Sequence, residues 1–575
     1  MLSRLPRMLA AFSLLCAGAI PLSAAAQTIA YGSVGDGGDE AQAGSSSDVG
    51  SSGRRSRGSG GGRVKHTEVT PYIEARQLVT AELSPGDDVL TYSVLAVGVD
   101  AETTGLRNAA SLSLRYERRF GWGKKTSDTD LISGIARGYT TIMPGVQIEA
   151  GGLAERARFE QGGASVIDGL VDDDSVTQVY SVYAGPSVAT SAGDVSINAN
   201  YRFGYTKVEQ PDAFQNAPDG PAFDVFDDST IHAADVHAGV QPYEVLPVGL
   251  GAGASYVRED ISNLDQRVED FSARGDVTVP LSPTLAVVGG VGYEDVEISS
   301  RDVLRDGNGD PVIGNNGRYV TDKSSPRILA YDVDGLIWDA GVLWRPSPRT
   351  ALEAHLARRY GSTSVYGTFA YTPNSRSSIN IAVYDNVAGF GGQLNNALVN
   401  LPTEFTAVRN PLTGDIGSCV ASLDSGTCLT GAFGSVRSST FRARGVTASY
   451  AIKLNRIRTG IGAGYDRRKF IGAPGTILEA YNGVIEESYW LAAYLNGEID
   501  NKSSFSTNLY ANWFDTGAGF GSDVMTMGAT AAYYRSLTRR LSATAALGID
   551  GANRDDPNSE DYWAASALLG VRYSF

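Results

Sequence analysis

Cysteine and histidine are scarce in this chain, which contains three cysteines and four histidines among 575 residues. No histidine lies near Cys419 or Cys428, which disfavours a metal site at these thiols. A G-x-S-x-G nucleophile motif is absent, and no pair of carboxylates stands out as a candidate for glycoside hydrolysis. We therefore expect no enzymatic activity, no cofactor and no bound metal, and we keep hydrolysis only as the least favoured alternative.

Long hydrophobic runs are also missing. Beyond the first 26 residues, no stretch approaches the ~18 consecutive apolar residues that a membrane-spanning helix needs. Only 42% of residues are hydrophobic and the mean hydropathy is -0.13. These values still permit a membrane β-barrel, because only the lipid-facing half of each barrel strand must be apolar. The net charge of -16 disfavours a nucleic-acid partner, since phosphate binding requires a basic surface.

The amino-terminal region has the pattern of a secretory signal. Arg4 and Arg7 precede an apolar core over 8–22, and three consecutive small residues end the segment at 26. We therefore assign 1–26 as a signal peptide. Residues 27–66 are rich in glycine, serine and arginine and have too little apolar content to fold alone, so they are predicted to form a disordered periplasmic tail.

The last fourteen residues show the clearest strand pattern. Every second residue from Phe575 back to Trp563 is apolar, and the residues between them are mostly small or polar. A period of two indicates a strand with one apolar face. The segment resembles the closing strand of bacterial outer-membrane barrels. That resemblance implies that Val571, Tyr573 and Phe575 form a signal for the barrel-assembly machinery. The alternative is an edge strand of a soluble β-sandwich.

The same alternation recurs at 195–206, 505–514 and 540–550, and the apolar spacing of three and four that marks helices is absent there. Short turn-forming segments alternate with mostly longer polar segments. The rhythm predicts an all-β fold over 67–575: a transmembrane antiparallel β-barrel of about 22 strands, within a range of roughly 18 to 24. An even strand number places both chain ends in the periplasm, with short turns periplasmic and long loops outside the cell.

Ten segments are predicted to be the short turns: 103–108, 143–145, 191–194, 242–247, 281–284, 345–350, 373–376, 454–456, 499–504 and 537–539. The largest predicted loops are 209–230, 299–326, 385–437 and 472–488.

The longest of these loops, 385–437, contains Cys419 and Cys428, the two cysteines that remain once the signal is removed. In an oxidising compartment these two are predicted to form a disulfide. A barrel of about 22 strands is too wide for its own side chains to fill, and no folded plug domain precedes it. We therefore predict that this loop folds at least partly into the barrel mouth, and a loop that only covers the rim is the alternative.

Two acidic segments are candidate cation sites. Asp306, Asn308 and Asp310 have the alternating oxygen ligands that begin a calcium loop, but Pro311 occupies the glycine position and Gly317 the position of the bidentate glutamate. We expect an ordinary acidic turn there, and a solvated loop at 172–174.

Charged residues on the polar face of predicted strands are expected to face the lumen. His232 and His237 are an odd number apart, so they should point to opposite faces of one strand. A basic lumen would favour anionic solutes, whereas ion pairs across the wall would be structural. The charged residues predicted to face the lumen are Arg115, Arg202, Glu353, His355, Arg359, Arg458, Arg468 and Arg572.

One region resembles a known family. Trp344 begins a Trp-Arg-Pro-Ser-Pro-Arg-Thr turn, Arg358-Arg359-Tyr360-Gly361 follows, and Tyr371 begins a Tyr-Thr-Pro-Asn-Ser-Arg turn. This order of motifs resembles the β-barrel porins associated with exopolysaccharide and PEP-CTERM systems. The match covers fewer than a tenth of the residues and marks turns, so it implies no functional residues.

The resemblance implies a Gram-negative outer-membrane channel for exopolysaccharide export. A general diffusion porin and a structural or adhesive barrel with a closed lumen are the alternatives. The expected partners are outer-membrane lipid, lipopolysaccharide and the barrel-assembly machinery, with polysaccharide-export components as further candidates.

Overall fold

The computed structural model describes residues 66–159, 165–166, 176–209, 225–314, 318–403, 405–421, 426–517, 523–555 and 561–575. The predicted signal peptide, all but the last residue of the predicted tail, and the acidic segment 172–174 lie outside these residues. In the described part, no helix is long and apolar enough to cross a membrane.

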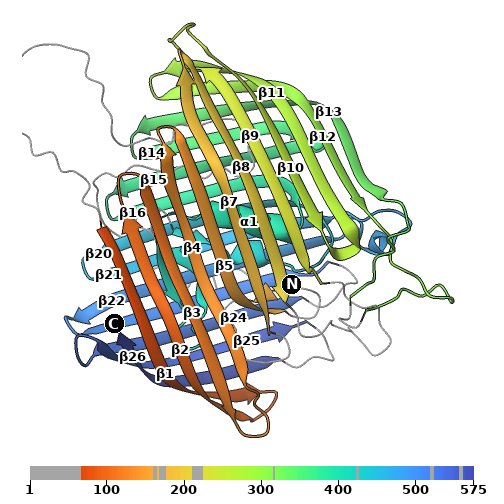
Figure 1. The fold of residues 1–575 in the computed structure, drawn as a ribbon. Helices are drawn as coiled ribbons and strands as arrows, with labels where there is room; N and C mark the ends of the chain where they lie inside the picture. The colour runs from red at the N-terminus through yellow and green to blue at the C-terminus, as the bar shows by residue number, and fades with distance from the viewer. Residues whose placement is uncertain are drawn as a thin grey trace, which may run out of the picture.

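Long β-strands make up nearly all of the described chain (Figure 1). They are β1 (His66–Ser84), β2 (Val89–Thr104), β3 (Asn108–Trp122), β4 (Thr129–Met143), β5 (Val146–Phe159), β7 (Val176–Ala192), β8 (Val195–Glu209), β9 (Asp228–Val240), β10 (Gly249–Ile261), β11 (Gln266–Ser282), β12 (Leu285–Ser300), β13 (Ile328–Ser347), β14 (Thr350–Arg359), β15 (Ser362–Asn374), β16 (Ser377–Ala388), β20 (Phe441–Leu454), β21 (Ile457–Phe470), β22 (Ile485–Asp500), β23 (Ser503–Asp515), β24 (Val524–Ser536), β25 (Leu541–Arg554) and β26 (Tyr562–Ser574).

These strands form one closed antiparallel ring. The main sheet contains 23 strands, of which the two-residue β6 (Ser165–Val166) is a side pairing to β5. The other 22 pair in chain order, and β26 pairs with β1 to close the barrel. Closure leaves no free sheet edge, which is the condition for a sheet to cross a lipid bilayer. The predicted 22-stranded transmembrane barrel is confirmed.

The register of the closing pair separates an apolar outer face from an inner face. Ile73 of β1 lies opposite Tyr573 of β26, and Leu78 lies opposite Leu568. On the outer face, Ile73 is 47% exposed and Leu569 is 69% exposed, as lipid-facing side chains are in the absence of lipid. Leu78 and Leu568 on the inner face are buried. The predicted division of the last strand into an apolar outer face and an inner face is therefore confirmed.

Ten short connections lie at one end of the barrel, here called the turn end, and they coincide with the ten predicted turns. Both described chain ends lie at the turn end as well, where the backbone amide of Phe575 donates to the carbonyl of Pro71 at 3.0 Å. The long loops lie at the opposite end, called the loop end. Short connections lie there too, among them the tight hairpin at Tyr360-Gly361, where both residues have positive φ (53° and 65°), as a primed two-residue turn requires.

Glycines on the inner face make room for aromatic rings on neighbouring strands. A Cβ atom on Gly98 would overlap the ring of Tyr72, and one on Gly528 would overlap the ring of Tyr510. Trp490 occupies the equivalent space above Gly464. This packing explains part of the enrichment that the sequence shows, with 68 glycines and 28 tyrosines.

Residues 389–440, named the inner loop, connect β16 to β20. They contain α1 (Phe390–Val399), α2 (Thr430–Phe433) and a small sheet of β17 (Thr406–Arg409), β18 (Ile416–Ala421) and β19 (Gly426–Cys428). Figure 1 shows α1 behind the strands around β7, and its contacts with β5, β7, β8 and β9 place it inside the ring. Two short 3₁₀ helices, Asn263–Asp265 and Ile477–Tyr481, lie in other loops at the loop end of the barrel.

The largest hydrophobic cluster lies inside the barrel, between the inner loop and the wall. Phe390 and Leu394 of α1 and Phe433 of α2 pack with wall residues that include Ile135 and Val179. Each of these side chains is at most 1% exposed. The barrel therefore has an apolar core within its lumen, in addition to its apolar outer surface.

Candidate functional site

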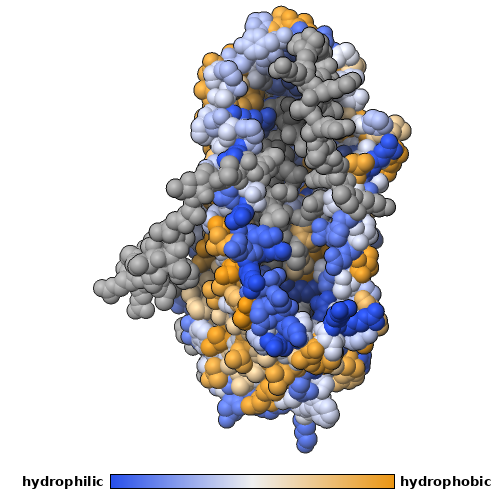
Figure 2. All heavy atoms as spheres, turned by 90° about the vertical axis from the view of Figure 1, so that its left-hand side faces the viewer, coloured by the Kyte–Doolittle hydropathy of each residue, from blue (hydrophilic) through white to orange (hydrophobic). Residues whose placement is uncertain are grey.

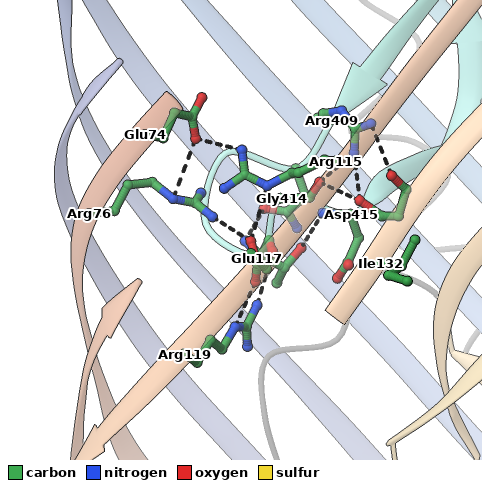
Figure 3. Close-up of polar contacts among 12 residues, drawn as sticks. Glu74, Arg76, Arg115, Glu117, Arg119, Ile132, Arg409, Gly414 and Asp415 are labelled. Atoms are coloured by element: carbon green, nitrogen blue, oxygen red, sulfur yellow. Dashed lines mark hydrogen bonds and ion pairs between the residues drawn. The ribbon is translucent and has the colours of Figure 1, made fainter. Parts of the chain in front are cut away.

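A charged cluster lines the inner face of β1 and β3 (Figure 3). Glu117 is at its centre and accepts hydrogen bonds from Arg76 (2.7 Å), Arg115 (3.1 Å) and Arg119 (2.8 Å). Arg115 also donates to Glu74 at 2.5 Å. Strand alternation places these five side chains on one face, because Glu74 and Arg76 are two residues apart, as are Arg115, Glu117 and Arg119.

The inner loop binds directly to this cluster. Arg76 donates to the carbonyl of Pro411 at 3.2 Å, and Arg119 donates to the carbonyl of Thr413 at 2.9 Å. Gly414, which has a φ of 79°, lies against the guanidinium of Arg115, where a Cβ atom would collide. The turn at 410–414 therefore fits against the wall at a position that only glycine allows.

Two further ion pairs hold the inner loop, one to β5 on the same side of the lumen as the charged cluster and one to β22 on the opposite side. Asp415 accepts from Arg156 of β5 at 2.6 Å, and both side chains are buried. Arg437, near the other end of the loop, pairs with Glu486 of β22. Arg468 of β21 donates to the carbonyl of Ser435 at 2.9 Å. The loop is thus bonded to wall strands on both sides of the lumen.

Glu259 of β10 anchors the beginning of α1. Its carboxylate accepts from the backbone amides of Gly389 (2.7 Å) and Gly392 (2.8 Å), which are among the amides that the first turn of a helix leaves unpaired. Arg202 of β8 donates to Asn396 on the same helix. The wall therefore supplies the capping group that the sequence of α1 lacks.

The inner loop reaches beyond the middle of the barrel. Leu412 packs against Leu78 and Leu568, and Leu568 lies near the centre of β26. The backbone amide of Phe405 donates to Ser111 at 3.3 Å, close to the turn end of β3. The prediction that the long loop folds into the barrel mouth is confirmed, and the loop penetrates further than the mouth.

A second charged cluster lies on β11 to β14. His355 contacts Asp339 through Nδ1 and Glu353 through Nε2, both at 3.1 Å. Arg274 also pairs with Asp339, at 2.5 Å. Arg359 of β14 is held by Asp270 of β11 and Glu294 of β12, both at 3.3 Å. Both nitrogens of His355 are engaged, so the imidazole has no nitrogen left to exchange a proton with a substrate.

Strand register places all of the charged residues predicted to face the lumen on the inner face. Arg458 is exposed near the turn end, and Arg572 pairs with Glu74 at 3.7 Å and Asp100 at 2.8 Å. The predicted set was weighted toward arginine, whereas the structure places a carboxylate beside most of these arginines. Ion pairing across the wall accounts for them better than a basic passage does. Applying strand parity to every carboxylate would have found Glu74 and Glu259.

Other candidate residues have ordinary structural positions. His237 contacts Asp276 at 3.0 Å on the inner face, whereas His232 contacts the hydroxyl of Tyr201 at 2.8 Å on the outer face. The Asp306 carboxylate accepts from the backbone amides of Asn308 and Asp310, which lower its pKa and form a local turn. No group of three metal-ligating side chains occurs among the described residues.

Cys419 and Cys428 lie in the small sheet of the inner loop. The register of β18 and β19 pairs Cys419 directly with Cys428. Directly opposed residues of an antiparallel pair have Cα atoms within the range that a disulfide spans. The disulfide stays a prediction that this backbone register supports.

The central parts of the inner faces of β22, β23 and β24, over 488–496, 504–514 and 526–534, differ from both charged clusters, and we name this sector the neutral wall. Both amide atoms of Asn508 are buried without a hydrogen-bond partner in the described chain, as are Asn512 Oδ1 and Thr530 Oγ1. Glu486 and Glu498 flank this sector on the inner face of β22. Between them, strand alternation gives the neutral wall as Ser488, Trp490, Ala492, Tyr494, Asn496, Ser504, Ser506, Asn508, Tyr510, Asn512, Phe514, Thr526, Gly528, Thr530, Ala532 and Tyr534, none of them charged.

No protein-family model and no curated protein matches the chain. Solved structures with a similar barrel include the ferric-catecholate import receptor Fiu from Escherichia coli K12 in its closed form, with 10% identity and a TM-score of 0.42 over 88% of this chain and 81% of Fiu. Acinetobacter baumannii OccAB4 has 10% identity and a TM-score of 0.29, covering 88% and 98%. Pseudomonas aeruginosa OprD has 9% identity and a TM-score of 0.27, covering 88% and 96%. The likeness is one of outer-membrane barrel architecture and extends no further.

Proposed function

We propose that this protein is an outer-membrane transport channel whose lumen is narrowed by the inner loop, and that its solute is a polysaccharide, with exopolysaccharide export as the special case. The observation that carries the proposal is the neutral wall. It presents side-chain amides, hydroxyls and aromatic rings to the lumen, and several of its buried polar atoms have no protein partner.

Saccharides are recognised by this combination of groups. Sugar hydroxyls donate to and accept from amides such as those of Asn508 and Asn512, which provide both functions in one side chain. The apolar faces of sugar rings pack against aromatic rings such as Tyr494 and Tyr510, which also carry a hydroxyl.

The charged clusters support the same assignment. Glu74 and Glu117 offset two of the three charges of Arg76, Arg115 and Arg119 on one side of the lumen. On another side, Asp339 and Asp276 face Arg274, and Asp339 and Glu353 contact His355. Charges that are paired in this way give a weak net field, so the charged walls favour neither anions nor cations strongly. A solute that interacts mainly through hydroxyl groups suits such a lumen better than a simple ion does.

A structural barrel with a closed lumen is the second candidate. The contacts of the inner loop with both sides of the wall favour it, because Arg156–Asp415 and Arg437–Glu486 are buried ion pairs that resist displacement. The transport channel and the closed structural barrel differ in one property, namely whether the barrel conducts ions while the inner loop is in place.

Planar-bilayer recording tests the proposal. The wild-type barrel should conduct, and neutral dextran oligosaccharides should reduce the current in a concentration-dependent manner. Replacing residues 392–434 by a short Gly-Ser linker should raise the conductance, since the closed ring of strands remains. Absence of any current in wild type, together with current in the deletion variant, would favour the closed structural barrel.

A point variant tests the neutral wall itself. Tyr510→Ala should weaken dextran block by roughly fivefold, because one aromatic contact contributes about 1 kcal/mol. The matched control is Asn200→Ala, on the inner face of β8 outside the neutral wall. Equal weakening in the two variants, or block by anionic oligosaccharides alone, would contradict a neutral saccharide track.

A further inference from the structure

Five cations gather on the outer face of the barrel at the loop end, and we name them the outer basic patch. Arg358 belongs to β14, Arg442 and Arg444 to β20, and Arg467 and Lys469 to β21. Their neighbours on these strands alternate with them, so all five point away from the lumen. The protein as a whole carries a net charge of -16, so this concentration of positive charge is local.

The patch contains like charges directly opposite each other. The register of β20 and β21 pairs Arg444 with Arg467 and Arg442 with Lys469. Like charges opposed across two strands destabilise the pairing unless something neutralises them. Asp385 and Glu487 are the carboxylates in contact, so five cations less two carboxylates leave an excess of three.

The geometry of the patch is fixed by its contacts. Asp385 is 2% exposed at its side chain and lies beneath both Arg442 (2.7 Å) and Arg444 (3.1 Å). Arg444 also donates to the carbonyl of Thr363 of β15, and Thr363 pairs with Arg358 of β14. These contacts hold the guanidinium groups in place while leaving part of each exposed, since the Arg444 side chain is 40% exposed.

An aromatic belt fixes the height of the patch relative to the membrane. The rings of Tyr465 and Tyr489 lie 4.9 Å apart on the outer face, with Tyr465 two residues closer to the turn end than Arg467. Trp338 lies opposite Arg358. Outward aromatic rings mark the membrane interface in barrels of this kind. The patch is therefore at the level of the lipid headgroups of the leaflet at the loop end.

Other outer cations at the loop end have nearby acidic partners. Arg118 of β3 pairs with Asp128 and Asp130, and Arg258 of β10 pairs with Asp260 at 2.6 Å. They show that an outward arginine does not by itself create a site. Unlike these two sites, the sector from β14 to β21 has more outward cations than carboxylates in contact with them.

We propose that the outer basic patch binds the phosphate groups of lipopolysaccharide, the phosphorylated glycolipid of the outer leaflet. Arginine presents a planar fork of donors that matches phosphate oxygens, and phosphate supplies the negative charge that the opposed cations need. The inference rests on the proposed outer-membrane location and is independent of whether the lumen transports a solute.

The test compares lipopolysaccharide binding by the purified detergent-solubilised barrel and two variants. Arg444→Gln/Arg467→Gln/Lys469→Gln should bind purified lipopolysaccharide at least about tenfold more weakly, since each lost charge-assisted hydrogen bond contributes about that factor or more. Arg118→Gln/Arg258→Gln should bind as wild type does. Heat-modifiable migration on gels verifies that each variant is folded, and because all five substitutions are outward and polar, folding should be retained.

Three outcomes overturn the proposal: unchanged binding by the triple variant, equal wild-type affinity for lipopolysaccharide from which the phosphates have been removed, or equal affinity for phosphatidylglycerol. The last would assign the patch to anionic lipid in general. A wild-type barrel that binds lipopolysaccharide but shows no conductance would leave this inference standing while contradicting transport.

Discussion

Glu117 is the residue on which the inner-wall charge balance depends most. Three arginines donate to its carboxylate, and its side chain is 4% exposed. Glu117→Gln keeps the shape but removes the charge that compensates them. We expect the free energy of unfolding to fall by roughly 3–5 kcal/mol, the usual cost of breaking a buried ion network. Urea unfolding of the barrel in lipid vesicles measures the change.

Asp130→Asn is the matched control for that variant. Asp130 also pairs with an arginine, Arg118, at 2.7 Å, but both side chains are more than 40% exposed. Exposed ion pairs contribute about 0–1 kcal/mol, so the urea midpoint should move little. Similar shifts for Asp130→Asn and Glu117→Gln would show that the inner wall is as well hydrated as the outer rim.

Leu569 tests the lipid-facing side of the closing strand. Its side chain is 69% exposed in the middle of β26, and Leu568 beside it is buried inside. Leu569→Arg places a charge in lipid at a cost of roughly 2–4 kcal/mol, so the folded fraction after insertion into vesicles should fall. Asn200→Arg, on the inner face of β8, should fold normally. Equal loss in both variants would overturn the assignment of the two faces.

At the scale of elements, the inner loop is held by a few discrete contacts. The buried Arg156–Asp415 pair joins it to β5 at 2.6 Å. Asp415→Asn should loosen the loop while leaving the ring of strands intact, so single-channel recordings should show more frequent transitions to higher conductance. Asp128→Asn, in the loop between β3 and β4, is the control. If Asp415→Asn gave a current trace indistinguishable from wild type, the other contacts of the inner loop would be sufficient to hold it without the Arg156–Asp415 pair.

The closing strand is the second element with a defined role. Tyr573 and Phe575 have ring centroids 5.1 Å apart, and Phe575 is 63% exposed at the end of the chain. Val571 is 45% exposed on the same outer face. An accessible aromatic end suits recognition by the barrel-assembly machinery, and this role stays a prediction.

At the scale of the whole molecule, the barrel has a turn end and a loop end. Figure 2, which looks at the left-hand side of Figure 1, shows strongly hydrophilic side chains gathered near the middle of that face and apolar ones around its lower part. The carboxy-terminus lies at that side, the turn end. We expect the turn end to face the periplasm and the loop end to face the exterior.

Cysteine labelling measures this orientation. In a Cys419→Ser/Cys428→Ser background, Gly307→Cys lies in the exposed loop between β12 and β13, where a Cβ atom meets no neighbour. Lys502→Cys lies in a tight turn at the other end. A membrane-impermeant maleimide should label Gly307→Cys in intact cells and Lys502→Cys only after permeabilisation. The reverse pattern would invert the topology.

Local sequence determined the strands, the ten turns and the two faces of the wall. Side chains of a strand alternate with a period of two, so Leu568 and Leu569 must point to opposite faces whatever else the chain does. Turns are equally local, because Gly, Pro, Asn and Asp set the backbone of the few residues that carry them. The strand number followed from counting these local signals, whereas the expectation of a closed barrel came from the resemblance of the last strand to barrel-closing strands.

Only the tertiary structure decided the path of the inner loop, the balance of lumen charges and the two surfaces proposed as binding sites. Arg76 and Pro411 are 335 residues apart in the chain, and Arg119 and Thr413 are 294 apart. Likewise, Arg444 and Arg467 become opposed only through the register of two strands. Such contacts depend on barrel closure and strand register, which bring distant residues together, and no periodicity within a short segment encodes them.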